Sequence, residues 1–114
     1  MTARFVRSTG LPETPLDAAA EFYERILPAI REDWDGVEEI VVSFEAADHS
    51  HRAWRLAAIQ ELAREATPCR VNGVVMSKDD HLASTEVLNY LHKAPGVTGQ
   101  LFAVDGTGAG IPGI

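Results

Sequence analysis

Apolar residues follow two alternating patterns along the chain. Short runs rich in β-branched residues predict strands at residues 3–8, 37–44, 70–76 and 100–104. Between them, apolar residues spaced three and four apart predict helices at residues 15–31, 50–66 and 84–93. Because short connections and crossover helices leave few other topologies, this order predicts the α/β class, with a small parallel four-stranded sheet and three helices.

The predicted strands differ in their expected burial. Residues 37–44 and 70–76 carry continuous β-branched runs, which indicate burial on both faces, as in a parallel sheet. Residues 3–8 are interrupted by Arg4 and Arg7. This strand is therefore expected at an edge of the sheet or in a partly exposed position.

The first predicted helix has the clearest limits. Thr14 is a suitable N-cap, Pro15 takes the first helical position, and Pro28 is expected to kink or tighten the last turn. The second helix is expected to be capped by Asp48 or Ser50. The apolar face predicted for the first helix consists of Leu16, Ala19, Ala20, Tyr23, Ile26, Leu27 and Ile30.

Composition and charge narrow the classes of protein. The 114 residues suit one domain, in which residues 105–114 are expected to be irregular. Ten Lys and Arg against seventeen Asp and Glu give a net charge of −7, which disfavours binding to nucleic acid or an anionic membrane. The sequence shows no signal peptide or membrane span, so a cytoplasmic location is the default expectation. Cys69 is the only cysteine, which excludes an internal disulfide, and we expect it to act as a small, half-buried hydrophobic residue.

Four short stretches form a recognisable pair of motifs. Residues 62–65 read Leu-Ala-Arg-Glu at a predicted helix end, and residues 70–72 read Arg-Val-Asn in the strand that follows. Residues 98–100 read Thr-Gly-Gln, and residues 105–106 read Asp-Gly. The first two stretches are similar to a helix end and the next strand, and the last two to the closing strand, in the C-terminal half of a short-chain dehydrogenase/reductase (SDR). The resemblance covers nearly all of the chain but only about the second half of a family member. It implies half of a Rossmann-like doubly wound fold.

The resemblance also implies what the sequence lacks. Family members hold a dinucleotide on a glycine-rich turn between a strand and a helix, and no such arrangement is found here. Residues 106–110 contain glycines, but no helical pattern follows them. We therefore expect no cofactor.

The family's catalytic pair is altered. Counted back from residues 62–65, its catalytic Tyr falls at Asp48 and its catalytic Lys at Arg52. An Asp is ionised at pH 7 and would be a poor acid, and an Arg cannot share a proton. Hydride transfer by the family mechanism is not expected, which leaves Asp48, His49, His51 and Arg52 as weak catalytic candidates.

The same loop allows two further interpretations. Asp48, His49 and His51 are residue types that bind zinc, but side chains two residues apart diverge, and a third ligand such as His81 would come from another loop. We expect a polar capping segment and no metal. An alternative function is that of a small-ligand-binding protein or enzyme using Asp48, His49, His51 and His81, because these residues fall at the C-terminal edge of the predicted sheet, where ligands of open α/β sheets bind.

Our leading hypothesis is a non-catalytic SDR-like domain that acts through dimerisation or partner binding. Half a doubly wound sheet leaves strand 3–8 without the neighbour that family members provide. Family members associate through the helices equivalent to 15–31 and 50–66, which implies a homodimer, or a heterodimer with a full-length SDR-like protein whose dinucleotide site the chain could complete. The expected contact residues are Tyr23, Ile26, Ile30, Trp54 and Ala58.

Overall fold

The computed structural model describes residues 3–32, 34–76 and 81–103, without the side chains of 81–84. Its strands are β1 (Ala3–Ser8), β2 (Glu39–Glu45), β3 (Arg70–Met76) and β4 (Leu101–Ala103). Its helical segments are α1 (Pro15–Glu21), a π turn (Phe22–Ile26), α2 (Leu27–Arg31), a 3₁₀ turn (His49–His51), α3 (Arg52–Ala66) and α4 (His81–His92). The four strands are parallel and lie in the order β1-β2-β3-β4. The predicted α/β class is confirmed.

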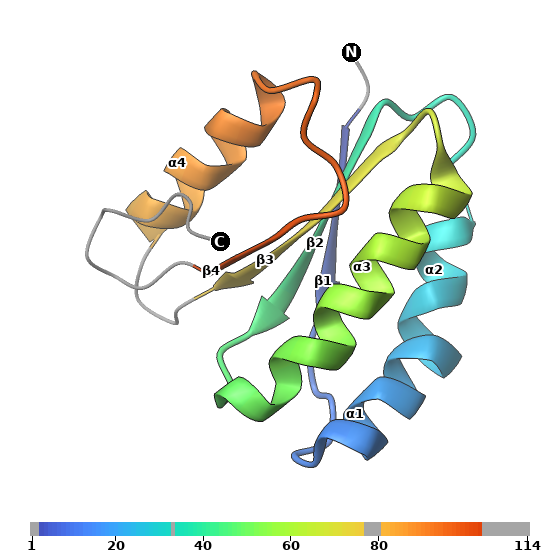
Figure 1. Cartoon of the computed structure of the whole chain (residues 1–114), viewed down its shortest axis with the longest axis vertical. Helices are drawn as coiled ribbons and strands as arrows, with labels where there is room; N and C mark the ends of the chain where they lie inside the picture. Colours follow the sequence, from blue (N-terminus) through green and yellow to red (C-terminus); the bar gives the residue numbers. More distant parts are fainter. Residues whose placement is uncertain (1–2, 33, 77–80, 104–114) are drawn as a thin grey trace.

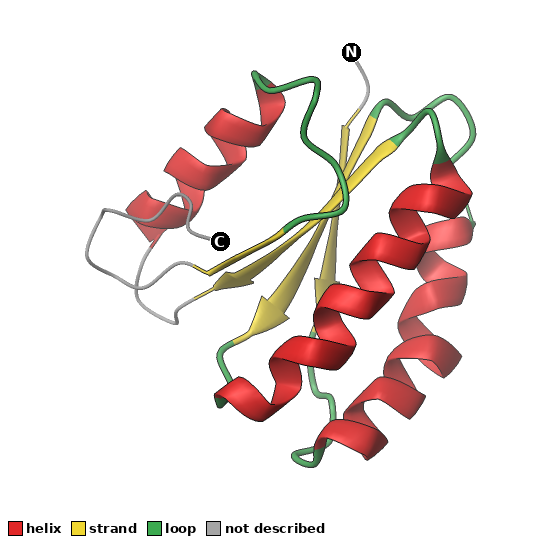
Figure 2. Ribbon diagram, viewed as in Figure 1, coloured by secondary structure: helices red, strands yellow, loops and turns green. Residues whose placement is uncertain are grey.

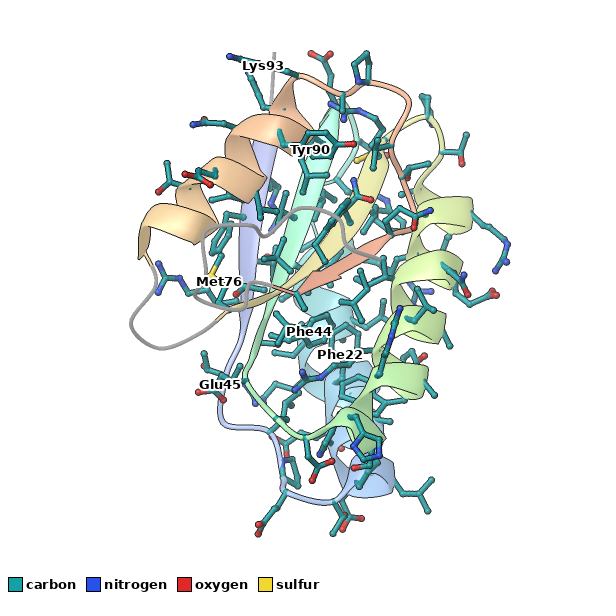
Figure 3. All side chains as sticks on the ribbon, turned by 60° about the vertical axis from the view of Figure 1, so that its left-hand side comes forward. Phe22, Phe44, Glu45, Met76, Tyr90 and Lys93 are labelled. Atoms are coloured by element: carbon teal, nitrogen blue, oxygen red, sulfur yellow. The ribbon has the colours of Figure 1, made fainter. Side chains whose placement is uncertain are left out.

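Helices cover the two faces of the sheet unequally (Figures 1 and 2). One face carries α1, the π turn, α2 and α3, which we call the α1–α3 layer, and the other carries α4. Two apolar clusters follow from this arrangement. The larger one lies under the α1–α3 layer, where Phe22 packs on Phe44 with ring centroids 5.7 Å apart (Figure 3). The smaller one joins α4 to the other face of the sheet through Val74, Val87 and Leu91.

The edge strand β1 shows how a strand with two arginines fits this sheet. It pairs only with β2 among the described strands. Arg4 reaches the end of α2, where its guanidinium donates to the carbonyls of Ala29 and Ile30 at 3.2 and 3.0 Å. Phe5 points to the opposite face and is 39% exposed. The predicted edge position is thus confirmed.

The first helix differs from its predicted geometry because it contains the π turn. The N–H of Leu27 donates to the carbonyl of Phe22, a spacing of five residues, just before Pro28. A proline cannot donate to the carbonyl four residues earlier, so the local backbone departs from α-helical bonding. The wider turn places Ala18, Phe22, Ile26 and Ile30 in the core at steps of four. Leu16, Ala20 and Tyr23, which the pattern placed on the buried face, are exposed.

The other boundaries differ from the prediction by a few residues. The second helix begins with a 3₁₀ turn after Asp48, so Asp48 and not Ser50 is the N-cap. The last helix begins at His81, three residues before the predicted start. The last strand covers Leu101–Ala103, and residue 104 lies outside the described residues, as does the tail expected at 105–114.

Candidate functional site

The candidate site lies where β1 and β2 end and α3 begins. Parallel strands bring their carboxyl ends to one edge of the sheet, which is the edge where open α/β folds bind ligands. The loop after β2 leads through Asp48 into the 3₁₀ turn His49–His51, so the polar residues singled out in the sequence stand at this edge. His81 begins α4, but its side chain lies outside the described residues, as do residues 78–80 and 106–110.

His51 is a structural residue with both ring nitrogens engaged. Its side chain is only 5% exposed. Nδ1 accepts a hydrogen bond from the indole N–H of Trp54 at 3.0 Å, so the ring proton belongs on Nε2, which lies 2.9 Å from the carbonyl oxygen of Glu13. His51 thereby ties the loop before α1 to the start of α3. It could bind a metal only by giving up one of these bonds.

Asp48 acts as the cap of the turn that follows it. Its Oδ1 accepts the N–H of Ser50 at 2.9 Å and also contacts the hydroxyl of Ser50. These hydrogen bonds hold the pKa of Asp48 below its ordinary value. The carboxyl group is therefore ionised at neutral pH and has no proton to donate. Within the described residues, no three His, Cys, Asp or Glu side chains gather closely enough to hold a metal ion.

Arg55 is the site residue that the sequence pattern did not reveal. It is 6% exposed, and its guanidinium stacks over the ring of Phe44 at 4.9 Å and near that of Trp54 at 5.8 Å. Its Nε has no hydrogen-bond partner among the described residues. Burial lowers the pKa of Arg55, while the charge of Glu45 acts in the opposite direction.

A signal for Arg55 was present in the spacing. It precedes Ile59 by four residues and Leu62 by seven, which places it on the buried face of α3. A charged residue at such a position is usually exposed, and its burial was not expected.

Arg55 lines two cavities at this edge, together with Ala47 and Asp48. The first, of about 370 Å³, is lined by Ser8, Leu11, Pro12, Glu13, Ala18, Glu45, Ala46, Ala47, Asp48, His51 and Arg55. The second, of about 280 Å³, is lined by Ala47, Asp48, His49, Arg52, Arg55, Val75, Leu101 and Ala103. Asp48, His49 and Arg52 thus line the 280 Å³ cavity together, whereas His51 lines the 370 Å³ cavity.

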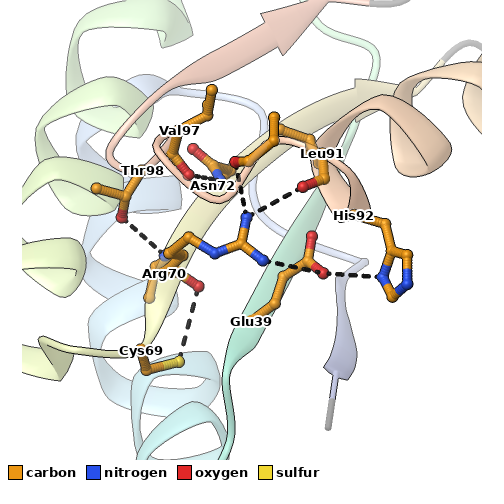
Figure 4. A network of polar contacts seen from close by, with 10 residues as sticks. Glu39, Cys69, Arg70, Asn72, Leu91, His92, Val97 and Thr98 are labelled. Atoms are coloured by element: carbon orange, nitrogen blue, oxygen red, sulfur yellow. Dashed lines mark hydrogen bonds and ion pairs between the residues drawn. The ribbon is translucent and has the colours of Figure 1, made fainter. Parts of the chain in front are cut away.

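A larger hollow lies at the opposite edge, between the amino ends of the strands, and its chemistry is structural. It measures about 620 Å³ and includes Arg70 and His92 in its lining. Arg70 donates at 3.0 Å to the carbonyls of both Leu91 and Ala94, at the end of α4, and lies 3.8 Å from the buried carboxylate of Glu39 (Figure 4). These contacts occupy the guanidinium. Size alone therefore does not make this hollow the better ligand site.

The residues expected at an interface divide into two groups. Ile26, Ile30 and Ala58 lie in the core, where they face the sheet and offer no surface to a partner, so their inclusion was wrong. Trp54 is half-buried, and Tyr23 is 43% exposed. Leu16, which was not among the expected contacts, is 86% exposed.

Several exposed apolar residues lie on the helices of the α1–α3 layer. We call this set the outer strip, and its members are Leu16, Ala20, Tyr23, Ala53 and Ala57. The helix that carries Leu16 packs beside α3, and the negative charge of Glu61 on α3 interacts electrostatically with Tyr23. Burial and this charge raise the pKa of Tyr23. The outer strip therefore spans two neighbouring helices.

Comparison with known proteins agrees with the fold. Among the helices that the structure describes, none combines the length and apolar character needed to cross a bilayer. No curated protein and no solved structure shows a significant match to the chain. Residues 6–104 match the model of a family described as SDR-like, short chain dehydrogenase-like protein. The match begins within β1 and covers β2, β3, β4 and every helix between the strands, and the chain belongs to this SDR-like family.

Proposed function

We propose that the chain is a non-catalytic SDR-like module that associates with a second copy of itself through the outer strip. The observation that carries the proposal is the exposure of Leu16, whose side chain stands 86% open to solvent on a helix beside α3. A large apolar side chain gains about 1.5–3 kcal/mol when it is fully buried. A partner that covers Leu16 and Tyr23 together would gain from both.

The shape of the outer strip suits helix packing across a two-fold axis. Ala53 and Ala57 lie one turn apart on α3 and are small, so a second helix could pack closely against α3 at these positions. Leu16 and Tyr23 project from the neighbouring helix and could fill the space on either side. Association through this pair of helices is also what the resemblance to the SDR family implies. A two-fold axis would pair each outer strip with the same residues of the other copy.

The chemistry at the carboxyl edge supports the non-catalytic part of the proposal. A general acid must hold its proton at the working pH, and the hydrogen bonds from Ser50 keep the pKa of Asp48 low. Arg52 takes the position of the family's lysine, and an arginine cannot share a proton as a lysine can. Neither residue can take the role that the family's Tyr and Lys share.

The association is tested by light scattering of the purified chain at micromolar concentration. We expect a dimer for the wild-type chain and a monomer for Leu16→Glu and Tyr23→Glu, because each puts a charge into the outer strip. Tyr90→Glu is the matched control: Tyr90 is 41% exposed but lies on α4, on the other side of the sheet. If the wild-type chain is a monomer, the homodimer is ruled out. If that monomer then forms a complex with a full-length SDR-like protein, the chain acts as half of a heterodimer.

Native mass spectrometry with NAD(H) and NADP(H) tests the absence of cofactor chemistry. We expect the dimer to carry no dinucleotide. A stoichiometric complex would contradict the non-catalytic proposal and would mean that association rebuilds a dinucleotide site.

A further inference from the structure

We infer that the cavity between the start of α3 and the ends of β3 and β4 binds a small organic carboxylate with an apolar body. We call it the α3 cavity; it is the 280 Å³ cavity that Arg55 shares with Arg52 and Leu101. The inference is independent of the proposed dimer, because the outer strip and the α3 cavity have no residue in common.

The guanidinium of Arg55 is buried, and the described residues compensate its charge only in part. A guanidinium taken out of water is costly unless it is paired and hydrogen-bonded. Here the rings of Phe44 and Trp54 supply part of the compensation, and Glu45 contributes at longer range. The Nε still has no partner among the described residues. A carboxylate in the α3 cavity would bring to Arg55 the counter-charge that these residues supply only in part.

The charges lining the α3 cavity favour an anion. Arg52 and Arg55 are three residues apart on α3 and so lie on the same side of the helix. Among the described residues of the lining, the acidic one is Asp48, whose carboxylate already accepts the N–H and contacts the hydroxyl of Ser50. These described residues therefore set two arginines against one engaged carboxylate, within a chain whose net charge is −7.

The neighbouring cavity gives the contrast. It shares Arg55 and Asp48 but adds Glu13 and Glu45 to its lining, and Oε1 of Glu45 accepts the N–H of Gly10 at 3.0 Å. With these added acidic residues beside a single arginine, the neighbouring cavity favours an anion less than the α3 cavity does. A carboxylate close to Arg55 is therefore favoured more in the α3 cavity than in the neighbouring cavity. This difference assigns the ligand to one cavity and not to the edge of the sheet in general.

The apolar part of the lining indicates that the body of the ligand is apolar. Val75 lies next to the end of β3, Leu101 and Ala103 are the first and last residues of β4, and all three line the α3 cavity together with the arginines. Apolar walls with a few convergent polar groups are typical of small-molecule sites. A volume of about 280 Å³ falls just below the roughly 300–1,000 Å³ usual for larger organic ligands. A short aliphatic or aromatic monocarboxylic acid fits this description.

Titration of the ¹⁵N-labelled chain with hexanoate, followed by NMR, tests the inference. We expect saturable shifts at the amides of Val75, Leu101 and Ala103, with weaker binding of acetate, which lacks the apolar body, and of 1-hexanol, which lacks the charge. Loss of one charge-assisted hydrogen bond lowers affinity roughly tenfold or more. Arg52→Gln should show that loss, and Arg52 is exposed, so the variant should fold.

Two further variants make the test specific. Arg64→Gln removes an exposed arginine from the far end of α3 and should bind hexanoate as the wild-type chain does. Arg55→Gln should abolish binding; if it fails to fold, Arg52→Gln decides. The inference is overturned if hexanoate causes no saturable shift, if 1-hexanol binds equally well, or if inorganic phosphate competes as strongly as hexanoate. Light scattering of the same samples reads the dimer separately.

Discussion

Asn72 and Gln100, 28 residues apart, are joined by a hydrogen bond of 3.1 Å from the backbone N–H of Gln100 to Oδ1 of Asn72. The amide nitrogen of Asn72 donates in turn to the carbonyl of Val97 at 3.0 Å. Beside them, the hydroxyl of Thr98 accepts the N–H of Val71 at 3.0 Å. The two stretches that carry the resemblance to the SDR family, residues 70–72 and 98–100, therefore contact each other directly. Their side chains join β3 to the segment that leads into β4.

Replacing Asn72 with leucine should destabilise the fold. The side chain is fully buried, so the substitution leaves the N–H of Gln100 and the carbonyl of Val97 without their partner. Each buried polar group left unpaired costs about 1–3 kcal/mol. We expect a loss of about 2 kcal/mol or more in the free energy of unfolding, measured with urea. Asn89→Leu, at an exposed position of α4, is the control and should change stability by less than about 0.5 kcal/mol.

The arrangement of elements could be predicted because its signals are local. The β-branched runs in residues 37–44 and 70–76 indicated central strands, and Arg4 and Arg7 indicated an edge. The surface of the first helix could not be predicted, because the π turn before Pro28 changes which residues face the sheet. The predicted apolar face included Leu16, which is exposed, and left out Ala18, which is buried.

The site was predicted only in outline. The sequence placed Asp48, His49 and His51 at the carboxyl edge of the sheet, where the structure has them, since parallel strands all end there. It did not show that His51 is held by Trp54 and the Glu13 carbonyl, because these contacts depend on the packing of a distant loop.

Gly73 should not tolerate a side chain. A Cβ at this position would lie 2.9 Å from Cγ1 of Ile59 and 2.9 Å from Cδ1 of Leu101, so α3 and β4 are both packed against a bare backbone. Overpacking a core of this kind costs about 1–3 kcal/mol. We expect Gly73→Ala to lower the urea midpoint accordingly. Gly96→Ala, where nothing lies within 4 Å of the added carbon, should have little effect, and an equal loss in both variants would contradict the packing argument.

The pair of Glu39 and Arg70 should be more important than the surface ion pairs. Both side chains are largely buried, at 3% and 12% exposure, and Arg70 also holds the end of α4 through Leu91 and Ala94. Among the described residues, Arg70→Met leaves the buried carboxylate of Glu39 with the ring of His92, 3.5 Å away, as its remaining partner, and breaking such a pair costs about 3–5 kcal/mol. Arg64→Met removes the partner of Glu61 at the surface, where a pair contributes at most about 1 kcal/mol. Thermal unfolding followed by circular dichroism should separate the two variants clearly, and similar melting temperatures would refute the prediction.

The thiol of Cys69 should make stability depend on pH in the alkaline range. Burial raises the pKa of Cys69 above its ordinary value of 9.0, against a weaker opposing effect of Arg70. The folded chain thus keeps a proton that the unfolded chain releases, so the free energy of unfolding should fall as pH rises above this ordinary value. Urea midpoints measured across this range should decline less in Cys69→Ala, which has no thiol to titrate.

A thiol reagent should modify the native chain far more slowly than the urea-unfolded chain at the same pH, because only the thiolate reacts. Equal rates in the two states would show that Cys69 is not held protonated by the fold.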